Sequence, residues 1–169
     1  MINGQLDIVM NGHINQMTNK WDIRFIKIAK EVSTWSKDPS KQIGTVVVKD
    51  RRILSTGYNG LPYGMDDDLL LTCSREEKLE YIIHGEVNCI MNAAKNGISL
   101  NDSTIYVWGL PICNHCAKAI VQSGIKNVVM TKSSFENPIW QDIYNNYSNK
   151  ILSAANIGIT IIDDEQLDL

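Results

Sequence analysis

The sequence contains few of the features that mark membrane, fibrous or low-complexity proteins. Its 169 residues include only 11 glycines and 4 prolines, which argues against a linker-dominated chain. The longest stretch without Lys, Arg, Asp or Glu is 103–117, shorter than the about 20 residues that a membrane span needs. No cationic region followed by an apolar block lies near the N-terminus, so we expect no signal peptide. We therefore expect a cytoplasmic protein without membrane contacts.

Excess positive charge is also absent. The formal net charge is −3 and the Lys and Arg residues are scattered, so we expect no nucleic-acid polymer as a partner. Leu, Ile, Val and Phe together exceed the ~20% below which a chain is expected to stay disordered, so a packed core can form. Residues 1–20 are polar and Asn-rich with weak periodicity. We therefore predict an N-terminal arm over 1–20 and a single domain over 21–169.

The apolar pattern predicts alternating helices and strands. Helical spacing begins at Trp21 and breaks before Asp38 and Pro39, and two β-branched runs separated by Asp50 and Arg51 predict a hairpin. No element is assigned to 66–83. The predicted elements are a helix over 21–35, strands at 44–49 and 52–57, a helix over 85–96, a strand at 104–108, a helix over 114–123, a strand at 127–130, a helix over 138–151 and a strand at 157–162. This order predicts an α/β fold with helices on both faces of one sheet.

The four cysteines suggest metal or redox chemistry rather than a disulfide framework. Cys113 and Cys116 form a C-x-x-C pair, which in a reducing compartment indicates a metal site or a redox-active dithiol. Cys73 and Cys89 are isolated in the sequence. We expect both to be buried small hydrophobic residues.

A candidate zinc site follows from two predicted helix starts. His84, Gly85 and Glu86 begin one helix, and Cys113 and Cys116 begin the next. A helix N-terminus favours the thiolate form of cysteine. One imidazole and two thiolates form a three-ligand zinc site with the fourth position open for water. We therefore predict one catalytic zinc per chain, with Glu86 accepting a proton from that water. His115, between the two cysteines, is expected to face solvent.

Other readings of the same residues stay open. The C-x-x-C pair alone fits a thiol oxidoreductase. The full cluster also fits a zinc-stabilised binding module without activity, although a structural zinc is closed by a fourth ligand and needs no carboxylate such as Glu86 beside it.

Three longer segments surround these residues: GTVVVKDRRILSTGYNGLP, HGEVNCIMNAAKNG and IYVWGLPICNHCAKAIVQSGIKNVV. The H-x-E…P-C-x-x-C pattern is the signature of zinc deaminases. With these segments the chain resembles the deoxycytidylate deaminases, a branch of the zinc-dependent cytidine deaminase superfamily. The alternative within this class is a deaminase of another cytosine or adenine nucleoside or nucleotide. The resemblance runs from about 21 to 162. It implies a three-layer α/β/α sandwich with a central mixed five-stranded sheet. It also implies hydrolysis of dCMP to dUMP and ammonia, supplying dUMP for thymidylate synthesis, by a homohexamer that dCTP with Mg²⁺ activates and dTTP inhibits.

The resemblance also assigns roles to residues of this chain. His84, Cys113 and Cys116 would bind zinc, and Glu86 would carry protons. The other implied contacts are Ser36 and Lys37 with the substrate phosphate, Asn59 with the sugar, Asn59 and Gly60 with the effector, and Phe135 with the pyrimidine. The alternatives are a solvated polar turn at 36–37, a turn-forming Asn59 and a core Phe135. Gly60 is expected to need a positive φ or a close backbone approach to the effector nucleotide.

Three departures from the family pattern concern the same site. Gly85 stands where the family usually has Ala, and Ile112 separates Pro111 from Cys113. In the segment where some relatives carry ligands of a second zinc, this chain has only Cys73, so we expect a single zinc. Trp21, Trp35 and Trp140 are expected to be core residues or subunit contacts.

Overall fold

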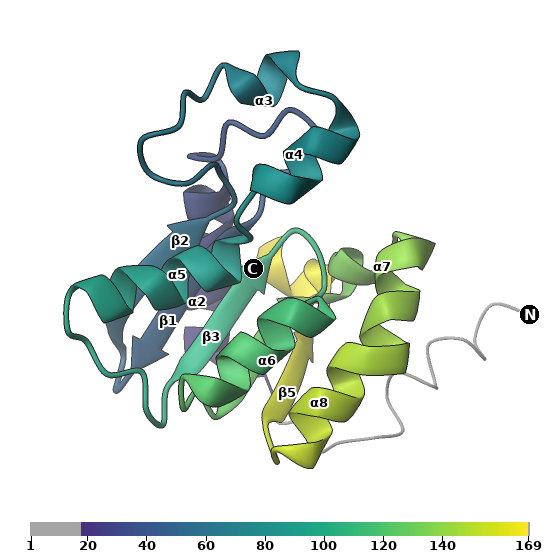
Figure 1. The fold of residues 1–169 in the computed structure, drawn as a ribbon. Helices are drawn as coiled ribbons and strands as arrows, with labels where there is room; N and C mark the ends of the chain where they lie inside the picture. Colours follow the sequence, from purple (N-terminus) through teal and green to yellow (C-terminus); the bar gives the residue numbers. More distant parts are fainter. Residues whose placement is uncertain (1–17, 169) are drawn as a thin grey trace, which may run out of the picture.

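The computed structural model describes residues 18–168, so residues 1–17 of the predicted arm lie outside it. The order of elements agrees with the prediction, with two further short helices within 66–83 (Figure 1). The strands are β1 (Gly44–Lys49), β2 (Arg52–Tyr58), β3 (Thr104–Trp108), β4 (Asn127–Thr131) and β5 (Gly158–Ile162). The helices are α2 (Lys20–Ser33), α3 (Leu69–Thr72), α4 (Arg75–Tyr81), α5 (Gly85–Lys95), α6 (Asn114–Gln122), α7 (Pro138–Ile143) and α8 (Asn149–Ala154), with short 3-10 or π turns at Lys132–Phe135, Tyr144–Ser148 and Asp164–Asp168.

The sheet is mixed and five-stranded, as the resemblance implies. Its strand order is β2-β1-β3-β4-β5. Strand β1 is antiparallel to both of its neighbours, whereas β3, β4 and β5 run parallel to one another. The hairpin between β1 and β2 turns at Asp50 and Arg51, which both adopt positive φ, at 51° and 63°. Two left-handed residues in succession match the right-handed twist of the flanking strands, so the predicted hairpin is confirmed.

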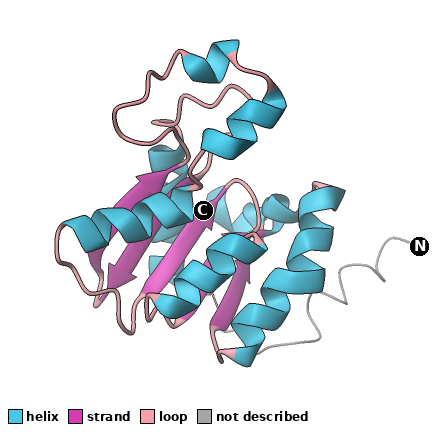
Figure 2. Ribbon diagram, in the orientation of Figure 1, coloured by secondary structure: helices cyan, strands magenta, loops and turns pink. Residues whose placement is uncertain are grey.

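Helices cover both faces of the sheet, which confirms the three-layer α/β/α prediction (Figure 2). Helix α2 lies on one face, and α5, α6 and α8 lie on the other (Figure 1). Each face has its own core cluster. Under α2, the cluster contains Phe25, Ile26, Ala29, Val32, Val46, Val48, Tyr106, Val129 and Ile162. None of the helices within residues 18–168 is long and apolar enough to cross a membrane.

The predicted final helix is confirmed and contains a π-helical segment that the apolar pattern does not predict. Asn137 caps its start by accepting hydrogen bonds from the backbone N–H groups of Ile139 and Trp140, with Pro138 at the first helical position, as expected. A π-helical segment at Tyr144–Ser148 connects α7 with α8 without a break in the helix. Such a segment shifts the helical register by one residue, and the sequence periodicity does not reveal this shift.

A close backbone contact fixes α5 against β2. A Cβ at Gly57 would lie 2.3 Å from the Cys89 nitrogen and 2.4 Å from the Gly85 oxygen, so only glycine fits there without displacing the helix. The contact involves the first turn of α5, and therefore places His84 and Glu86 relative to the sheet. Cys89 is fully buried, as expected, whereas Cys73 is only partly buried.

Candidate active site

Three potential metal ligands converge where α5 and α6 begin. His84 is the N-cap of α5 and Cys113 is the N-cap of α6, with Cys116 in the first turn of α6. The Nδ1 atom of His84 lies 3.4 Å from the Sγ atoms of both cysteines, and the three atoms lie within 4.8 Å of one another. With Zn–S bonds of ~2.3 Å and Zn–N bonds of ~2.1 Å, donors of a tetrahedral site lie about 3.6–3.8 Å apart. These three side chains therefore fit a single zinc ion.

The same contacts set the protonation of the cluster. Hydrogen bonds from Cys116 and His84 lower the pKa of Cys113 to about 4, and the backbone N–H of Cys116 also donates to its Sγ. The hydrogen bond to Cys113 raises the pKa of His84 to about 9. The hydrogen bond to Cys113, together with burial, raises the pKa of the Cys116 thiol well above its usual value. The metal-free cluster thus favours one thiolate beside an imidazolium and one thiol.

Glu86 lies in the first turn of α5, beside the ligand cluster. Its side chain is buried, with 4% of the residue exposed. Burial raises the pKa of its carboxyl group, and the charge of His84 partly opposes this effect. A raised pKa makes a carboxyl group a stronger base and lets it hold a proton more readily, so this group can act as both base and acid.

A cavity of about 320 Å³ connects these groups with side chains from distant parts of the chain. The ligand residues His84 and Cys113 line it together with Glu86. Helix α4 contributes Arg75 and Lys78. The remaining lining residues are Asp38, Ser40, Lys41, Ile43, Asn59, Leu79, Ile82, Leu110, Pro111 and Trp140. The cavity therefore combines an apolar wall, a buried acid and several cationic groups, as a site for a small anionic molecule requires.

Comparison with protein families places this cluster in a known context. The family model "Cytidine and deoxycytidylate deaminase zinc-binding region" matches residues 19–132. The chain belongs to this family. The matched range contains His84, Glu86, Cys113 and Cys116, and ends just after β4.

Individual relatives agree with this membership. A probable deoxycytidylate deaminase of Caenorhabditis elegans is 43% identical over 117 residues, which span 67% of this chain and 58% of the worm protein. The deoxycytidylate deaminase of Mus musculus is 39% identical over 124 residues, 70% of this chain and 68% of the mouse protein. The crystal structure of dCMP deaminase from the cyanophage S-TIM5, in complex with dCMP and dUMP, has a TM-score of 0.67 at 22% identity, covering 87% of this chain and 100% of the phage chain. This structural likeness supports the fold.

The loop residues Ser36 and Lys37 are not among the residues that line the cavity. The buried Ser36 hydroxyl donates to the Asn59 carbonyl at 2.7 Å and accepts from the Asp38 N–H at 3.2 Å. Lys37 is exposed and pairs with Asp67 at 2.6 Å. The same loop instead presents Asp38, Ser40 and Lys41 to the cavity. The loop that was predicted to contact the substrate phosphate therefore reaches the cavity through Asp38, Ser40 and Lys41 and not through Ser36 and Lys37.

Asn59 lines the cavity, but its side-chain amide is already hydrogen-bonded to other groups of the protein. Its Oδ1 accepts from the Ile43 N–H at 2.8 Å, and its Nδ2 donates to Asp38 at 3.1 Å and to the Lys41 carbonyl at 2.9 Å. Gly60 forms an isolated antiparallel bridge with Ile83. Its φ is not positive, and an added Cβ would meet only Tyr58, at 3.8 Å. Gly60 therefore does not adopt the expected positive φ, and its expected backbone approach to the effector nucleotide stays a prediction.

Trp140, and not Phe135, provides the aromatic side chain of the cavity. The 3-10 turn after β4 directs Phe135 into the core, where it packs edge-on against Tyr144 with ring centroids 5.0 Å apart. Trp140 lines the cavity and lies edge-on to His84, with centroids 6.4 Å apart. The core alternative for Phe135 agrees with the structure. Trp140 packs against the core, as expected, but its place in the cavity wall beside the ligand cluster was not predicted.

Sequence reasoning also missed the cationic side chains of α4. A capping box begins this helix: Ser74 accepts from the Glu77 N–H, and Glu77 accepts from the Ser74 N–H. The S-x-x-E spacing of Ser74 and Glu77 is a readable signal for a helix start. It would have placed Arg75 and Lys78 on a helix just before His84.

Proposed function

We propose that the protein catalyses the hydrolytic deamination of dCMP to dUMP and ammonia. In this proposal, His84, Cys113 and Cys116 hold one zinc ion and Glu86 carries protons. The observation that supports it is the convergence of three ligand atoms within 4.8 Å beside a buried carboxyl group in one cavity. Glu86 favours an enzyme over a structural zinc module, because a closed site has no use for this acid.

The chemistry requires water to add to C4 of the cytosine ring and the C4–N4 bond to break. A zinc ion at the cluster would activate the attacking water as a Lewis acid. Glu86 accepts a proton from the water and delivers it to N3. It then takes the proton of the new C4 hydroxyl group and delivers it to N4, so that ammonia leaves as the C4 carbonyl forms. Its buried position and raised pKa suit both transfers. The products are dUMP and one ammonia for each water consumed.

The charge of the cavity lining supports a nucleotide as substrate. Lys41, Arg75 and Lys78 all line it, and neither Lys41 nor Arg75 forms an ion pair with another residue in 18–168. A 5′-phosphate is the part of dCMP that such groups recognise, and a guanidinium can bind it in a bidentate manner. Lys41 and Arg75 are therefore better placed for the phosphate than Ser36 and Lys37. Trp140 is better placed than Phe135 as the wall beside the pyrimidine.

Regulation and assembly remain predictions that rest on the family resemblance. They comprise activation by dCTP with Mg²⁺, inhibition by dTTP, effector contacts at Asn59 and Gly60, and a homohexamer. A cytoplasmic role in supplying dUMP for thymidylate synthesis has the same basis. The position of Asn59 on the cavity wall is compatible with coupling between an effector and the substrate.

A substrate panel tests the proposal directly. Zinc-loaded protein is assayed for ammonia release from dCMP, dCTP, deoxycytidine and adenosine, and dCMP saturation is repeated with dCTP plus Mg²⁺ and with dTTP plus Mg²⁺. We expect dCMP to have the highest kcat/KM. A zinc module would release no ammonia, and a preference for deoxycytidine would reject the nucleotide assignment. Superimposable dCMP curves in all conditions would reject the predicted regulation while leaving the reaction intact.

A further inference from the structure

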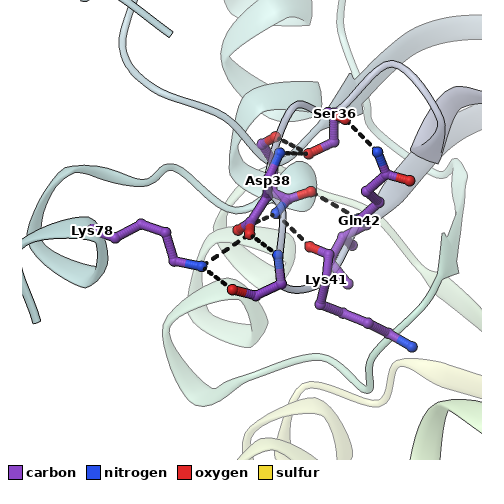
Figure 3. Close-up of polar contacts among 8 residues, drawn as sticks. Ser36, Asp38, Lys41, Gln42 and Lys78 are labelled. Carbon is purple, nitrogen blue, oxygen red and sulfur yellow. Dashed lines mark hydrogen bonds and ion pairs between the residues drawn. The ribbon is translucent and has the colours of Figure 1, made fainter. Parts of the chain in front are cut away.

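Lys78 of α4 forms a buried ion pair in the wall of the cavity. Its Nζ lies 2.9 Å from Oδ1 of Asp38 and 2.8 Å from the Ser40 hydroxyl (Figure 3). The side chains of Lys78 and Asp38 are only 10% and 5% exposed. The other ion pairs found within 18–168, Lys37–Asp67 and Lys132–Asp163, have side chains at least 45% exposed. Lysine and aspartate are rarely this buried unless they are paired, so the Lys78–Asp38 contact is a specific feature of this site.

The pair continues into a hydrogen-bond network that fixes the loop 36–43. Asp38 accepts from the Ser40 N–H at 2.8 Å and from the Asn59 amide at 3.1 Å. Asn59 in turn binds the backbone of Lys41 and Ile43. Figure 3 shows Lys78 reaching from its helix to this network, whereas the ammonium group of Lys41 extends away from it. The position of the loop backbone at 38–41 thus depends on a side chain from α4.

We propose that Lys78 is a positioning residue for the substrate's anionic group. It holds Asp38 and Ser40 so that the loop presents Lys41 to the cavity that Arg75 also lines, and thereby couples α4 to phosphate recognition. This inference rests on the proposed function and extends it to nucleotide-over-nucleoside specificity. Among the described residues 18–168, Lys78 forms hydrogen bonds and an ion pair with Asp38 and Ser40 and none with the ligand cluster or Glu86, so we expect its loss to leave proton transfer intact.

The test compares Lys78→Met with Lys132→Met on zinc-loaded protein. Both substitutions remove one ammonium group and one ion pair, but Lys132 is exposed and pairs with Asp163 at 3.5 Å. We expect Lys78→Met to raise KM for dCMP about tenfold or more, with kcat within about threefold, since the lost interaction serves binding. Its kcat/KM for deoxycytidine, which lacks the phosphate, should stay within about threefold of the parent. Lys132→Met should match the parent on both substrates.

The double variant Asp38→Asn with Lys78→Met separates positioning from folding. It buries neither charge, so it provides the same comparison if Lys78→Met fails to fold with an unpaired Asp38. Because Lys78 and Asp38 act through one contact, the KM of the double variant for dCMP should not exceed the larger of the KM values of Lys78→Met and Asp38→Asn alone. If the increases in KM for dCMP of the two single variants multiply in the double variant, the inference is overturned. An equal fall of kcat on dCMP and on deoxycytidine would also overturn it.

Amide hydrogen exchange gives a readout that does not depend on activity. Residues 38–43 should exchange faster in Lys78→Met than in Lys132→Met if Lys78 fixes the loop. Unchanged exchange would overturn the inference even in an active enzyme. If the parent does not deaminate dCMP, the proposed function fails, and the exchange result still decides whether Lys78 holds this loop.

Discussion

Glu86 and His84 lie two residues apart at the start of α5, where side chains two positions apart can both face the cavity. In the middle of a helix, this separation would turn them about 200° from each other. The N-cap residue His84 has an extended backbone, with φ −68° and ψ 150°, which removes that restriction. His84 can therefore bind a metal while Glu86 accepts and donates a proton.

Replacing Glu86 with glutamine tests the proton carrier. Glu86→Gln keeps the size of the side chain and some hydrogen bonding but removes the base. We expect turnover of dCMP to fall by ~10²–10⁴-fold, the range for loss of general acid–base catalysis, with zinc content unchanged. The measurements are kcat and zinc per chain. Turnover within tenfold of the parent at full zinc occupancy would show that another group carries the proton.

The protonation of the ligand cluster predicts how zinc affinity depends on pH. Zinc binding needs a neutral His84 and two thiolates, but the pKa of His84 is raised to about 9 and that of Cys116 is also raised. Protons must therefore leave on binding, and affinity rises with pH below about 9, by about tenfold per unit for each proton released. Competition with a chelator at several pH values measures the slope. An affinity that is flat across neutral pH would contradict this protonation state.

At the scale of elements, long amphipathic segments were predictable and short turns were not. The helix starts at His84 and Cys113 could be placed because apolar spacing follows each of them and glycine closes both helices, at Gly97 and Gly124. The segment that contains α3 and α4 is too short for periodicity to identify, so the cationic lining from α4 was missed. The Phe135 side chain points into the core because of a 3-10 turn, and sequence propensity alone does not predict this turn.

The packing of α5 on β2 predicts opposite outcomes for two glycines near the cavity. Gly57→Ala would place a Cβ 2.3 Å from the backbone of α5, whereas Gly60→Ala would meet nothing closer than 3.8 Å. We expect Gly57→Ala to reduce the free energy of unfolding by about 1–3 kcal/mol or more and to weaken zinc retention. Gly60→Ala should change it by less than about 0.5 kcal/mol. Denaturant unfolding and metal analysis of both variants provide the comparison; equal stabilities would contradict the packing.

At the scale of the whole molecule, the ligand cluster joins two parts of the sheet. Helix α5 packs mainly on β1 and β2, in the antiparallel part, while α6 follows β3, where the parallel part begins. A metal bound by residues of both helices therefore adds a link between these parts. Because the ligands are apart in the unfolded chain, the binding free energy contributes to the folding free energy.

Removal of zinc should consequently lower thermal stability. Zinc at about 1,000 times its Kd stabilises the folded state by about 4 kcal/mol, which for a chain of this size corresponds to a Tm shift of about 8–16 °C. We expect a similar drop after chelation and in Cys113→Ala. Cys73→Ala, the matched control, should retain one zinc per chain and the parent Tm. Loss of a second zinc equivalent in Cys73→Ala would show that the expected count is wrong.

The bridge between Gly60 and Ile83 closes the segment 61–82 at its base. The two residues exchange backbone hydrogen bonds of 3.1 and 2.8 Å, and α3 and α4 project from the sheet beyond them (Figure 1). A segment whose ends are already paired can be replaced by one of different length with little added loop-closure entropy. Residues 61–82 therefore form a unit for chimeras between relatives: an exchange that keeps Lys78, the partner of the buried Asp38, should leave the ligand cluster, which lies outside the unit, in place.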